Sequence, residues 1–158
     1  MKNIWAPWRV QYIRSEKPKG CLLCEKAAQG QDRENYLLYR GRLNFAMLNK
    51  YPYNPGHIMV SPYRHAGSME DLTDEELLDN MLLVKKCLKA LKEAFSPQGF
   101  NLGINLGRVA GAGVEDHVHV HIVPRWNGDT NFMPVVAETK VISEAMDSTY
   151  EHLKRRLG

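Results

Sequence analysis

The most informative stretch of the sequence is His117-Val118-His119-Val120-His121-Ile122-Val123. Histidine alternates in it with apolar residues, and a period of two is typical of a β-strand whose two faces differ. We therefore expect a strand over 117–123 with its imidazoles on one face and its valines on the other. Histidine is neither a strong strand former nor a preferred core residue, so packing alone does not explain the pattern. Imidazoles gathered on one face indicate a chemical site, because they bind metals, move protons or act as nucleophiles.

Four further strands and three helices are predicted around this stretch. Apolar and aromatic runs predict strands over 36–40, 44–48, 56–61 and 100–105. Helical patterns predict a short helix over 22–30, a long helix that follows a capping box at 73–76 and ends before Pro97, and a C-terminal helix over 143–157. The strands 100–105 and 117–123 are expected to pair in antiparallel fashion. The order predicts the α+β class, with an antiparallel sheet of about five strands, a long helix and a C-terminal helix.

The long helix carries an apolar stripe. Its members recur at spacings of three and four, as on one face of a helix: Leu77, Met81, Val84, Leu88, Leu91 and Phe95. We expect this stripe to face the core. Part of it could instead form a dimer seam, and the two interpretations are compatible.

The composition is that of one globular domain. Of the 158 residues, 44% are hydrophobic and 25% are charged, and we expect a single domain over 1–158, with an N-terminal arm over 1–20 and a C-terminal extension over 126–158. The net charge of +3 suits a small polyanionic ligand but is too weak to indicate a nucleic-acid partner. No apolar run is long enough to cross a membrane and no secretion signal begins the chain, so the cytoplasm is the expected compartment.

A glycine-rich loop precedes the histidine stretch. Gly107, Gly111 and Gly113 lack side-chain bulk, and backbone N–H groups in such a loop can point at an anion. Alone, the loop is more often a simple turn. Beside the histidines it favours a site in which backbone donors hold a phosphate chain while His119 attacks phosphorus, since a neutral imidazole is nucleophilic at pH 7.

The cysteines form one pair and one isolated residue. Cys21 and Cys24 are spaced as CxxC, which without a secretion signal indicates a metal or redox site. Two cysteines three residues apart can both ligate one tetrahedral zinc ion. The redox alternative is weaker, because no thioredoxin-like βαβ pattern surrounds the pair. Cys87 is expected to be a small buried residue of the long helix.

Several segments together resemble the histidine triad (HIT) superfamily. The stretch HVHVHIV is similar to the family signature, in which histidines alternate with apolar residues. Residues 48–50 and 55–62 resemble its ribose-binding strand pair, and residues 71–76 resemble the segment that opens its long helix. The resemblance covers roughly residues 20–125. It implies the HIT-like fold and a homodimer.

The resemblance also implies roles for individual residues. His119 would be the nucleophile that forms a covalent nucleotidyl–imidazole intermediate, His121 would contact the α-phosphate oxygens, and His57 would support the nucleophile from a neighbouring strand. Asn49 would bind the ribose hydroxyls. Phe45 would be part of the apolar wall of the base pocket, with ordinary core packing as the alternative.

The segments that flank the signature resemble one branch of the family. HIT hydrolases of the fragile-histidine-triad type carry Gly-Gln shortly before the first histidine, whereas this sequence reads Ala112-Gly113. The missing glutamine disfavours simple hydrolysis. The Trp-Ala-Pro-Trp-Arg start and the segment 124–133 resemble the bacterial diadenosine tetraphosphate phosphorylases, which use inorganic phosphate as the acceptor. Arg125 and Asn131 would help to seat that phosphate, with a structured surface loop as the alternative.

The resemblance completes the metal site as well. Related galactose-1-phosphate uridylyltransferases add two histidines to a CxxC zinc site, and the matching positions here are His65 and His117. A structural zinc site of Cys21, Cys24, His65 and His117 is therefore implied, and His117 would then take no part in proton chemistry.

Four interpretations remain open at this point. The same first step serves a dinucleoside polyphosphate phosphorylase, a hydrolase or a nucleoside phosphoramidase, which differ in leaving group and acceptor. The chain could also be a non-catalytic nucleotide- or zinc-binding module. The joint presence of Asn49, His57 and the glycine loop favours the enzyme, because a plain metal site does not need them.

Overall fold

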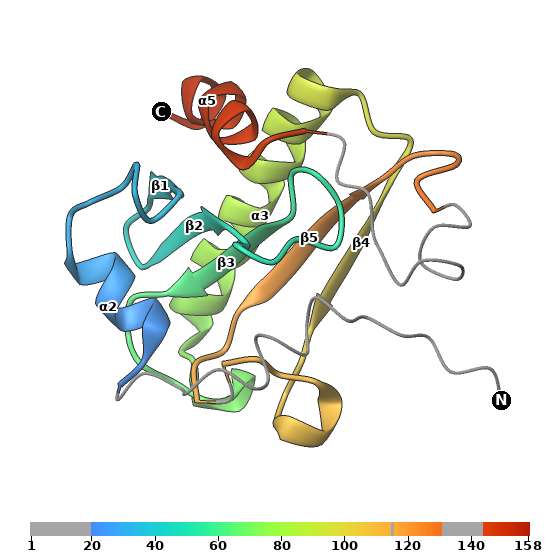
Figure 1. Ribbon diagram of the computed structural model, residues 1–158. Helices are drawn as coiled ribbons and strands as arrows, with labels where there is room; N and C mark the ends of the chain where they lie inside the picture. Colours follow the sequence, from blue (N-terminus) through green and yellow to red (C-terminus); the bar gives the residue numbers. More distant parts are fainter. Residues whose placement is uncertain (1–19, 115, 131–143) are drawn as a thin grey trace, which may run out of the picture.

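The computed structural model describes residues 20–114, 116–130 and 144–158 of the chain. Its five strands form one antiparallel sheet in the order β1-β2-β3-β5-β4 (Figure 1). The strands are β1 (Leu37–Arg40), β2 (Asn44–Leu48), β3 (Ile58–Pro62), β4 (Gly99–Ile104) and β5 (Val120–Arg125). The expected α+β class and the antiparallel pairing of the last two strands are confirmed. Residues 1–19 of the expected N-terminal arm, and Asn131, lie outside the described residues.

Three helices accompany the sheet. They are α2 (Leu22–Ala28), α3 (Asp74–Phe95) and α5 (Met146–Leu157), and short 3₁₀ turns cover Met69–Asp71 and Arg108–Ala110. The predicted capping box opens α3: Thr73 Oγ1 accepts from the Glu76 N–H at 3.2 Å, and Glu76 Oε2 accepts from the Thr73 N–H at 2.9 Å. The α3 helix packs against strands β2, β3 and β5 and against α5. The short α2 helix lies at the β1–β2 side of the molecule (Figure 1).

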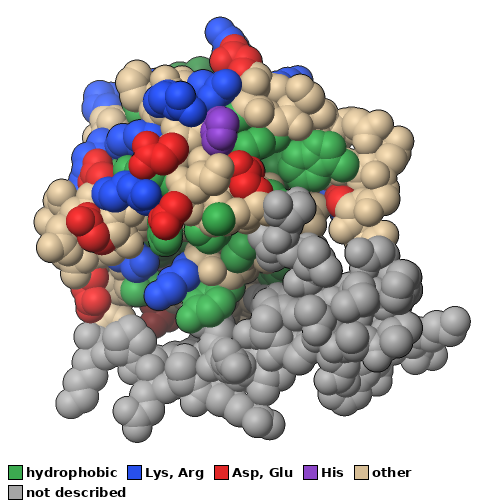
Figure 2. Space-filling model, turned by 45° about the horizontal axis from the view of Figure 1, so that its top comes forward, with side chains coloured by type: hydrophobic (Ala, Val, Ile, Leu, Met, Phe, Trp, Pro, Cys, Tyr) green, Lys and Arg blue, Asp and Glu red, His purple; other side chains and the backbone are tan. Residues whose placement is uncertain are grey.

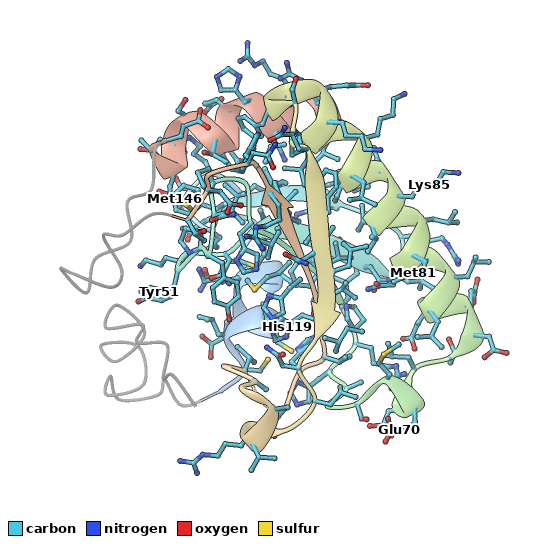
Figure 3. All side chains as sticks on the ribbon, turned by 90° about the vertical axis from the view of Figure 1, so that its right-hand side faces the viewer. Tyr51, Glu70, Met81, Lys85, His119 and Met146 are labelled. Atoms are coloured by element: carbon cyan, nitrogen blue, oxygen red, sulfur yellow. The ribbon has the colours of Figure 1, made fainter. Side chains whose placement is uncertain are left out.

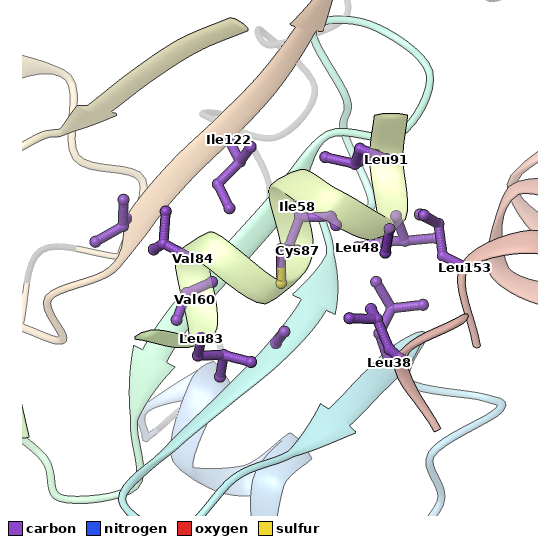
Figure 4. Close-up of a cluster of buried hydrophobic side chains, with 14 of the residues drawn as sticks. Leu38, Leu48, Ile58, Val60, Leu83, Val84, Cys87, Leu91, Ile122 and Leu153 are labelled. Atoms are coloured by element: carbon purple, nitrogen blue, oxygen red, sulfur yellow. The ribbon is translucent and has the colours of Figure 1, made fainter. Parts of the chain in front are cut away.

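The strands divide their side chains between two core clusters. The larger cluster lies between the sheet and the helices α3 and α5, and Figure 4 labels Leu48 and Ile122 in it. Ala46 of β2 and Val120 of β5 belong to the same cluster. Cys87 of α3 is fully buried in this cluster. Phe45 and Met47 alternate with Ala46 and Leu48, so they form a smaller cluster on the other face with Leu23 of α2. By the same alternation, His119 and His121 lie on the face away from α3.

The predicted stripe on α3 is partly out of phase. Val84 and Leu91 are buried as expected, but Met81 is 48% exposed. At the start of α3, polar side chains face the sheet instead. Glu76 accepts from Arg64, and Asn80 donates to Asn44 Oδ1 at 2.9 Å. These polar contacts occupy the side of the helix that faces the sheet, so Met81 lies on the outward side.

The predicted strand over 117–123 begins only at Val120. Its partner β3 pairs Ile58 with Ile122 and Val60 with Val120, so continued pairing would place Pro62 opposite Val118. Proline has no N–H to donate to a ladder, which ends the regular pairing. The Val118 N–H donates to the Ala66 carbonyl at 2.7 Å instead. His117 therefore lies in an irregular segment that leads into β5.

The surface shows no dominant charge on the face that Figure 2 displays. Lysine and arginine side chains are interspersed there with aspartate and glutamate (Figure 2). Within the described ranges, no helix combines the length and the apolar content that a membrane crossing requires.

Candidate active site and metal site

Two cavities meet at His121 on the open face of the sheet. The first has a volume of about 270 Å³, and its lining includes Asn49, Gly111, Gly113 and His119. The second has a volume of about 380 Å³ and is lined by Asn101, Gly103 and Arg125 among others. His121, Tyr53 and Asn105 line both cavities. Figure 3 looks onto β4 and shows His119 on the side of this strand away from Met81 of α3.

His119 is held as a neutral imidazole with a defined tautomer. Its ring is buried, with 4% of the residue exposed, and Nδ1 lies 2.8 Å from the carbonyl oxygen of His117. A carbonyl only accepts, so Nδ1 carries the proton and donates it, which leaves the lone pair on Nε2. Burial is the main cause that lowers the pKa of His119, partly offset by the hydrogen bond to His117. This imidazole is therefore suited to nucleophilic attack through Nε2.

A chain of hydrogen bonds gives His121 the opposite tautomer. The backbone N–H of Tyr53 donates to Nδ1 of His57 at 3.1 Å, so the proton of neutral His57 lies on Nε2. Nε2 of His57 lies 2.9 Å from Nδ1 of His121 and donates to it. Neutral His121 then carries its own proton on Nε2, where it is a donor. His119 thus offers a lone pair and His121 offers a proton, and the centroids of their rings are 4.7 Å apart.

The contact of His57 refines its expected role. Its hydrogen bond is to His121, so any support for His119 would pass through the ring of His121. Tyr53, which sequence reasoning missed, contributes its N–H and stacks its ring on His57 with 4.9 Å between centroids. A backbone donor of this kind leaves no side-chain signal in the sequence.

Asn105 is a second residue that sequence reasoning missed. It lies just after β4, and its half-buried side chain has no hydrogen-bond partner among the described residues. An amide at the junction of two cavities has donors and an acceptor to offer to a ligand. Its position directly before the glycine loop was the available signal.

The expected nucleotide-binding residues fall into two groups. Asn49, Gly111 and Gly113 line the first cavity, and Asn49 Oδ1 accepts from the Tyr51 N–H at 2.9 Å. Phe45 is fully buried in the smaller core cluster and packs on Tyr63 with 5.3 Å between ring centroids. It is not among the residues that line either of these cavities.

Arg125 lies in the second cavity and is held by two neighbours. Its Nε and Nη2 donate to both carboxylate oxygens of Asp129, at 2.5 and 2.9 Å, and its Nη1 donates to Asn101 Oδ1 at 2.7 Å. The guanidinium holds the pKa of Asp129 well below its usual range. The charge of Arg125 is therefore balanced locally, and the side chain of Asn101 is oriented by it.

The four expected metal ligands come together. Nδ1 of His117 lies 3.1 Å from Cys21 Sγ and 3.3 Å from Cys24 Sγ, and Nδ1 of His65 lies 3.5 Å from Cys24 Sγ. The ligand atoms all lie within 4.8 Å of one another. In a tetrahedral zinc site, sulfur and nitrogen ligands are about 3.5 Å apart. The four residues thus have the composition and the spacing of a metal site.

The protonation states also suit a cation. Nε2 of His117 lies 2.9 Å from the Pro62 carbonyl and donates to it, so Nδ1 is unprotonated and faces the cysteines. Burial, and then the neighbouring Cys21, raise the pKa of the Cys24 thiol to about 11. A metal ion in the cluster would supply the positive charge that stabilises thiolates there.

The fold and the site together define an α+β protein with paired histidines on the open face of an antiparallel sheet, beside a cysteine–histidine cluster. The chain belongs to the HIT family: the family model described as HIT domain matches residues 31–128. The chain is 40% identical to a protein named AP-4-A phosphorylase from Mycobacterium tuberculosis, over 94% of this chain and 80% of that protein. It is 41% identical to the asymmetrical bis(5'-nucleosyl)-tetraphosphatase of Schizosaccharomyces pombe, over 59% of this chain and 50% of that protein.

Solved structures agree with this assignment. A hypothetical histidine triad nucleotide-binding protein from Sulfolobus tokodaii is similar with a TM-score of 0.67 and 31% identity, over 87% of this chain and 89% of that chain. The family and the HIT-like fold expected from the sequence are thus confirmed. The two relatives named above are enzymes, and the protein is an enzyme of the HIT family.

Proposed function

We propose that the protein transfers a nucleotidyl group from dinucleoside polyphosphates, such as diadenosine tetraphosphate, through a covalent intermediate on His119. The observation that carries the proposal is the pair of opposite tautomers at His119 and His121. Nε2 of His119 attacks the α-phosphorus, a P–N bond forms, and the bond from phosphorus to the bridging oxygen breaks. The leaving nucleotide takes the electron pair, and the N–H of His121 stabilises the developing negative charge.

The second step uses inorganic phosphate as the acceptor. A phosphate oxygen attacks the same phosphorus, the P–N bond breaks, and His119 returns to its neutral form. From diadenosine tetraphosphate the products are ATP from the first step and ADP from the second. Arg125 is proposed to help to seat the phosphate, and the same role is proposed for Asn131 on sequence grounds alone.

The first cavity is the proposed seat of the transferred nucleotide. Asn49 lines it and would bind ribose hydroxyls through its amide, and Gly111 and Gly113 would let the backbone come close to phosphate oxygens. Lys26 and Lys50 also line this cavity. Burial, and then the charge of Lys50, lower the pKa of Lys26.

The experiment that tests the function is incubation with diadenosine tetraphosphate, with and without inorganic phosphate, followed by separation of the products. ADP plus ATP, formed only with phosphate, is the expected result. AMP plus ATP in phosphate-free buffer would make the enzyme a hydrolase. Turnover of a nucleoside phosphoramidate alone would make it a phosphoramidase.

A control variant separates catalysis from binding. His119→Ala should form no covalent nucleotidyl adduct by intact mass, and turnover should fall by at least about 10³-fold. Full turnover in this variant would contradict the mechanism. Nucleotide binding without any turnover in the wild type would favour the non-catalytic module.

We further propose that the cluster of Cys21, Cys24, His65 and His117 binds structural zinc. Four protein ligands leave no open coordination position, which is typical of a structural site. The ion would tie the start of α2 to the segment that leads into β5. It would supply no chemistry to the transfer itself.

A homodimer is the proposed assembly. Three apolar residues of α3 are largely exposed, with exposed fractions of 62% for Leu78, 48% for Met81 and 56% for Leu82. Strand β4 lies at the edge of the sheet next to this helix, as Figure 3 shows. An apolar helix face beside an open strand edge is suited to a two-fold contact with a second copy.

A further inference from the structure

His121 separates two cavities of comparable size. His121, Val123 and Arg125 share one face of β5, and His119 directly precedes the strand. The first cavity contains His119 and the second contains Val123 and Arg125, while His121 lines both. The second cavity therefore lies farther along β5 from the nucleophile. In a ligand that fills both cavities, the part between the two ends must lie beside His121.

We infer that the second cavity seats the nucleoside end of the leaving nucleotide; this rests on the function proposed above. In an in-line displacement, the attacking nitrogen and the leaving oxygen lie on opposite sides of phosphorus. With the transferred nucleotide in the first cavity beside His119, the leaving chain extends past His121 into the second. A substrate with a nucleoside at each end needs two such cavities, with the reacting phosphorus between them.

The size of the second cavity fits this occupant. Its volume of about 380 Å³ exceeds the 270 Å³ of the first cavity. Cavities of a few hundred cubic ångströms hold small organic ligands, whereas one phosphate ion would leave most of this space unfilled.

The chemistry of its lining also favours an uncharged polar group. Arg125 lines this cavity, and its charge is balanced by its ion pair with Asp129; its Nη1 also donates to the side-chain oxygen of Asn101. The Asn101 amide N–H groups are thereby left to donate to a base or a ribose. Tyr53 and Val123 add apolar surface against which a base can pack.

The same cavity would serve the second step. The acceptor must attack from the side that the leaving group has vacated, because each displacement is in line. Inorganic phosphate and the leaving ATP would then occupy overlapping space in turn. ATP should accordingly inhibit in competition with phosphate.

Gly103 provides a direct test. A Cβ atom built on it meets no heavy atom within 4 Å, and its φ lies outside the left-handed region, so a Cβ is tolerated there without backbone strain. It pairs with His121 across the β4–β5 ladder and lines the second cavity. Gly103→Phe would fill the cavity. Gly99, on the same strand, has the same open surroundings but lines neither of the two cavities, so Gly99→Phe is the matched control.

The experiment compares diadenosine tetraphosphate with adenosine 5'-tetraphosphate, which has the same number of phosphates but a single nucleoside. The ratio of kcat/KM for the first over the second should fall about tenfold or more in Gly103→Phe and stay at the wild-type value in Gly99→Phe. Asn101→Ala should lower the same ratio by a smaller factor. This second variant tests the inference even if Gly103→Phe does not fold.

Two outcomes would overturn the inference. Equal losses on both substrates in Gly103→Phe, with a native circular dichroism spectrum, would show that the second nucleoside is not seated there. An unchanged ratio in both Gly103→Phe and Asn101→Ala would show the same. Absence of turnover of either substrate by the wild type would instead overturn the proposed function, and with it this inference.

Discussion

The imidazoles of His57 and His121 are joined nitrogen to nitrogen, with Nε2 of His57 2.9 Å from Nδ1 of His121. Because the Tyr53 N–H occupies the other nitrogen of His57, the direction of this hydrogen bond is fixed. His57 is therefore a positioning residue that decides which nitrogen of His121 carries the proton.

Removal of this hydrogen bond should slow the chemical step more than it weakens binding. His57→Leu should lower the single-turnover rate of nucleotidylation on the order of 10²-fold, because His121 is no longer fixed as a donor. The measurement is rapid quenching followed by intact mass. His57→Gln, whose amide can still donate, should recover part of the rate at an unchanged KM. Identical losses in the two variants would indicate a packing role only.

The capping box of α3 predicts a dependence of stability on pH. The Arg64 guanidinium lowers the pKa of Glu76 to about 2, from an ordinary value of 4.5. The folded-state pKa is depressed, so the stabilisation is complete above 4.5 and is lost as the pH falls toward 2. Glu76→Gln should cost about 1 kcal/mol at neutral pH, because the charged pair is partly exposed, and the difference should vanish in acid.

Chemical unfolding at a series of pH values measures this effect. Arg42→Gln is the matched control, because Arg42 pairs with Glu75 at the same helix end but is mostly exposed. That variant should change stability little at any pH. A loss in Glu76→Gln that stays constant down to strong acid would contradict the assignment to the Arg64–Glu76 pair.

The cysteine–histidine cluster predicts one zinc ion per chain. His65→Ala should reduce the metal content, measured by elemental analysis after gel filtration, and should lower the thermal midpoint, because α2 is then no longer tied to the segment before β5. His152→Ala, on α5 at the opposite face of the sheet, should retain the metal. Equal metal content in the wild type and in His65→Ala would contradict the site.

The exposed apolar residues of α3 predict a dimer that a single charged substitution should dissociate. Met81→Lys should shift the molar mass measured by light scattering from two chains to one, because a lysine buried in the seam lacks a partner. Lys89→Ala, on the same helix at 80% side-chain exposure, should remain dimeric. A monomeric wild-type protein would contradict the assembly.

The periodicity of the histidine stretch predicted the face of the site, but not its internal connections. Alternation alone places His119 and His121 opposite Val120 and Ile122, and the structure agrees. The hydrogen bond from Tyr53 to His57 depends on a backbone N–H in a turn, which no pattern of side chains reveals. The division of the site into two cavities depends on where β4 passes beside His121, which is a tertiary property.

The errors on α3 and β5 have physical causes that lie far away in the sequence. Met81 was expected in the core because its spacing is helical, but Asn80 and Glu76 occupy the face toward the sheet through bonds to Asn44 and Arg64. The strand at 117–123 starts late because Pro62, on another strand, ends the ladder. Cys21 and His117 are 96 residues apart, so family resemblance, and not spacing, brought them together.

The burial of Cys87 makes thiol chemistry selective in the native protein. The chain has three cysteines, and burial raises the pKa of the Cys87 thiol to about 12, so this sulfur is shielded from reagents. An alkylating probe applied under native conditions therefore reports on Cys21 and Cys24 alone. Bound zinc would protect both, and its removal would expose both, so the number of labelled sulfurs per molecule is a direct gauge of metal occupancy during purification, storage or oxidative stress.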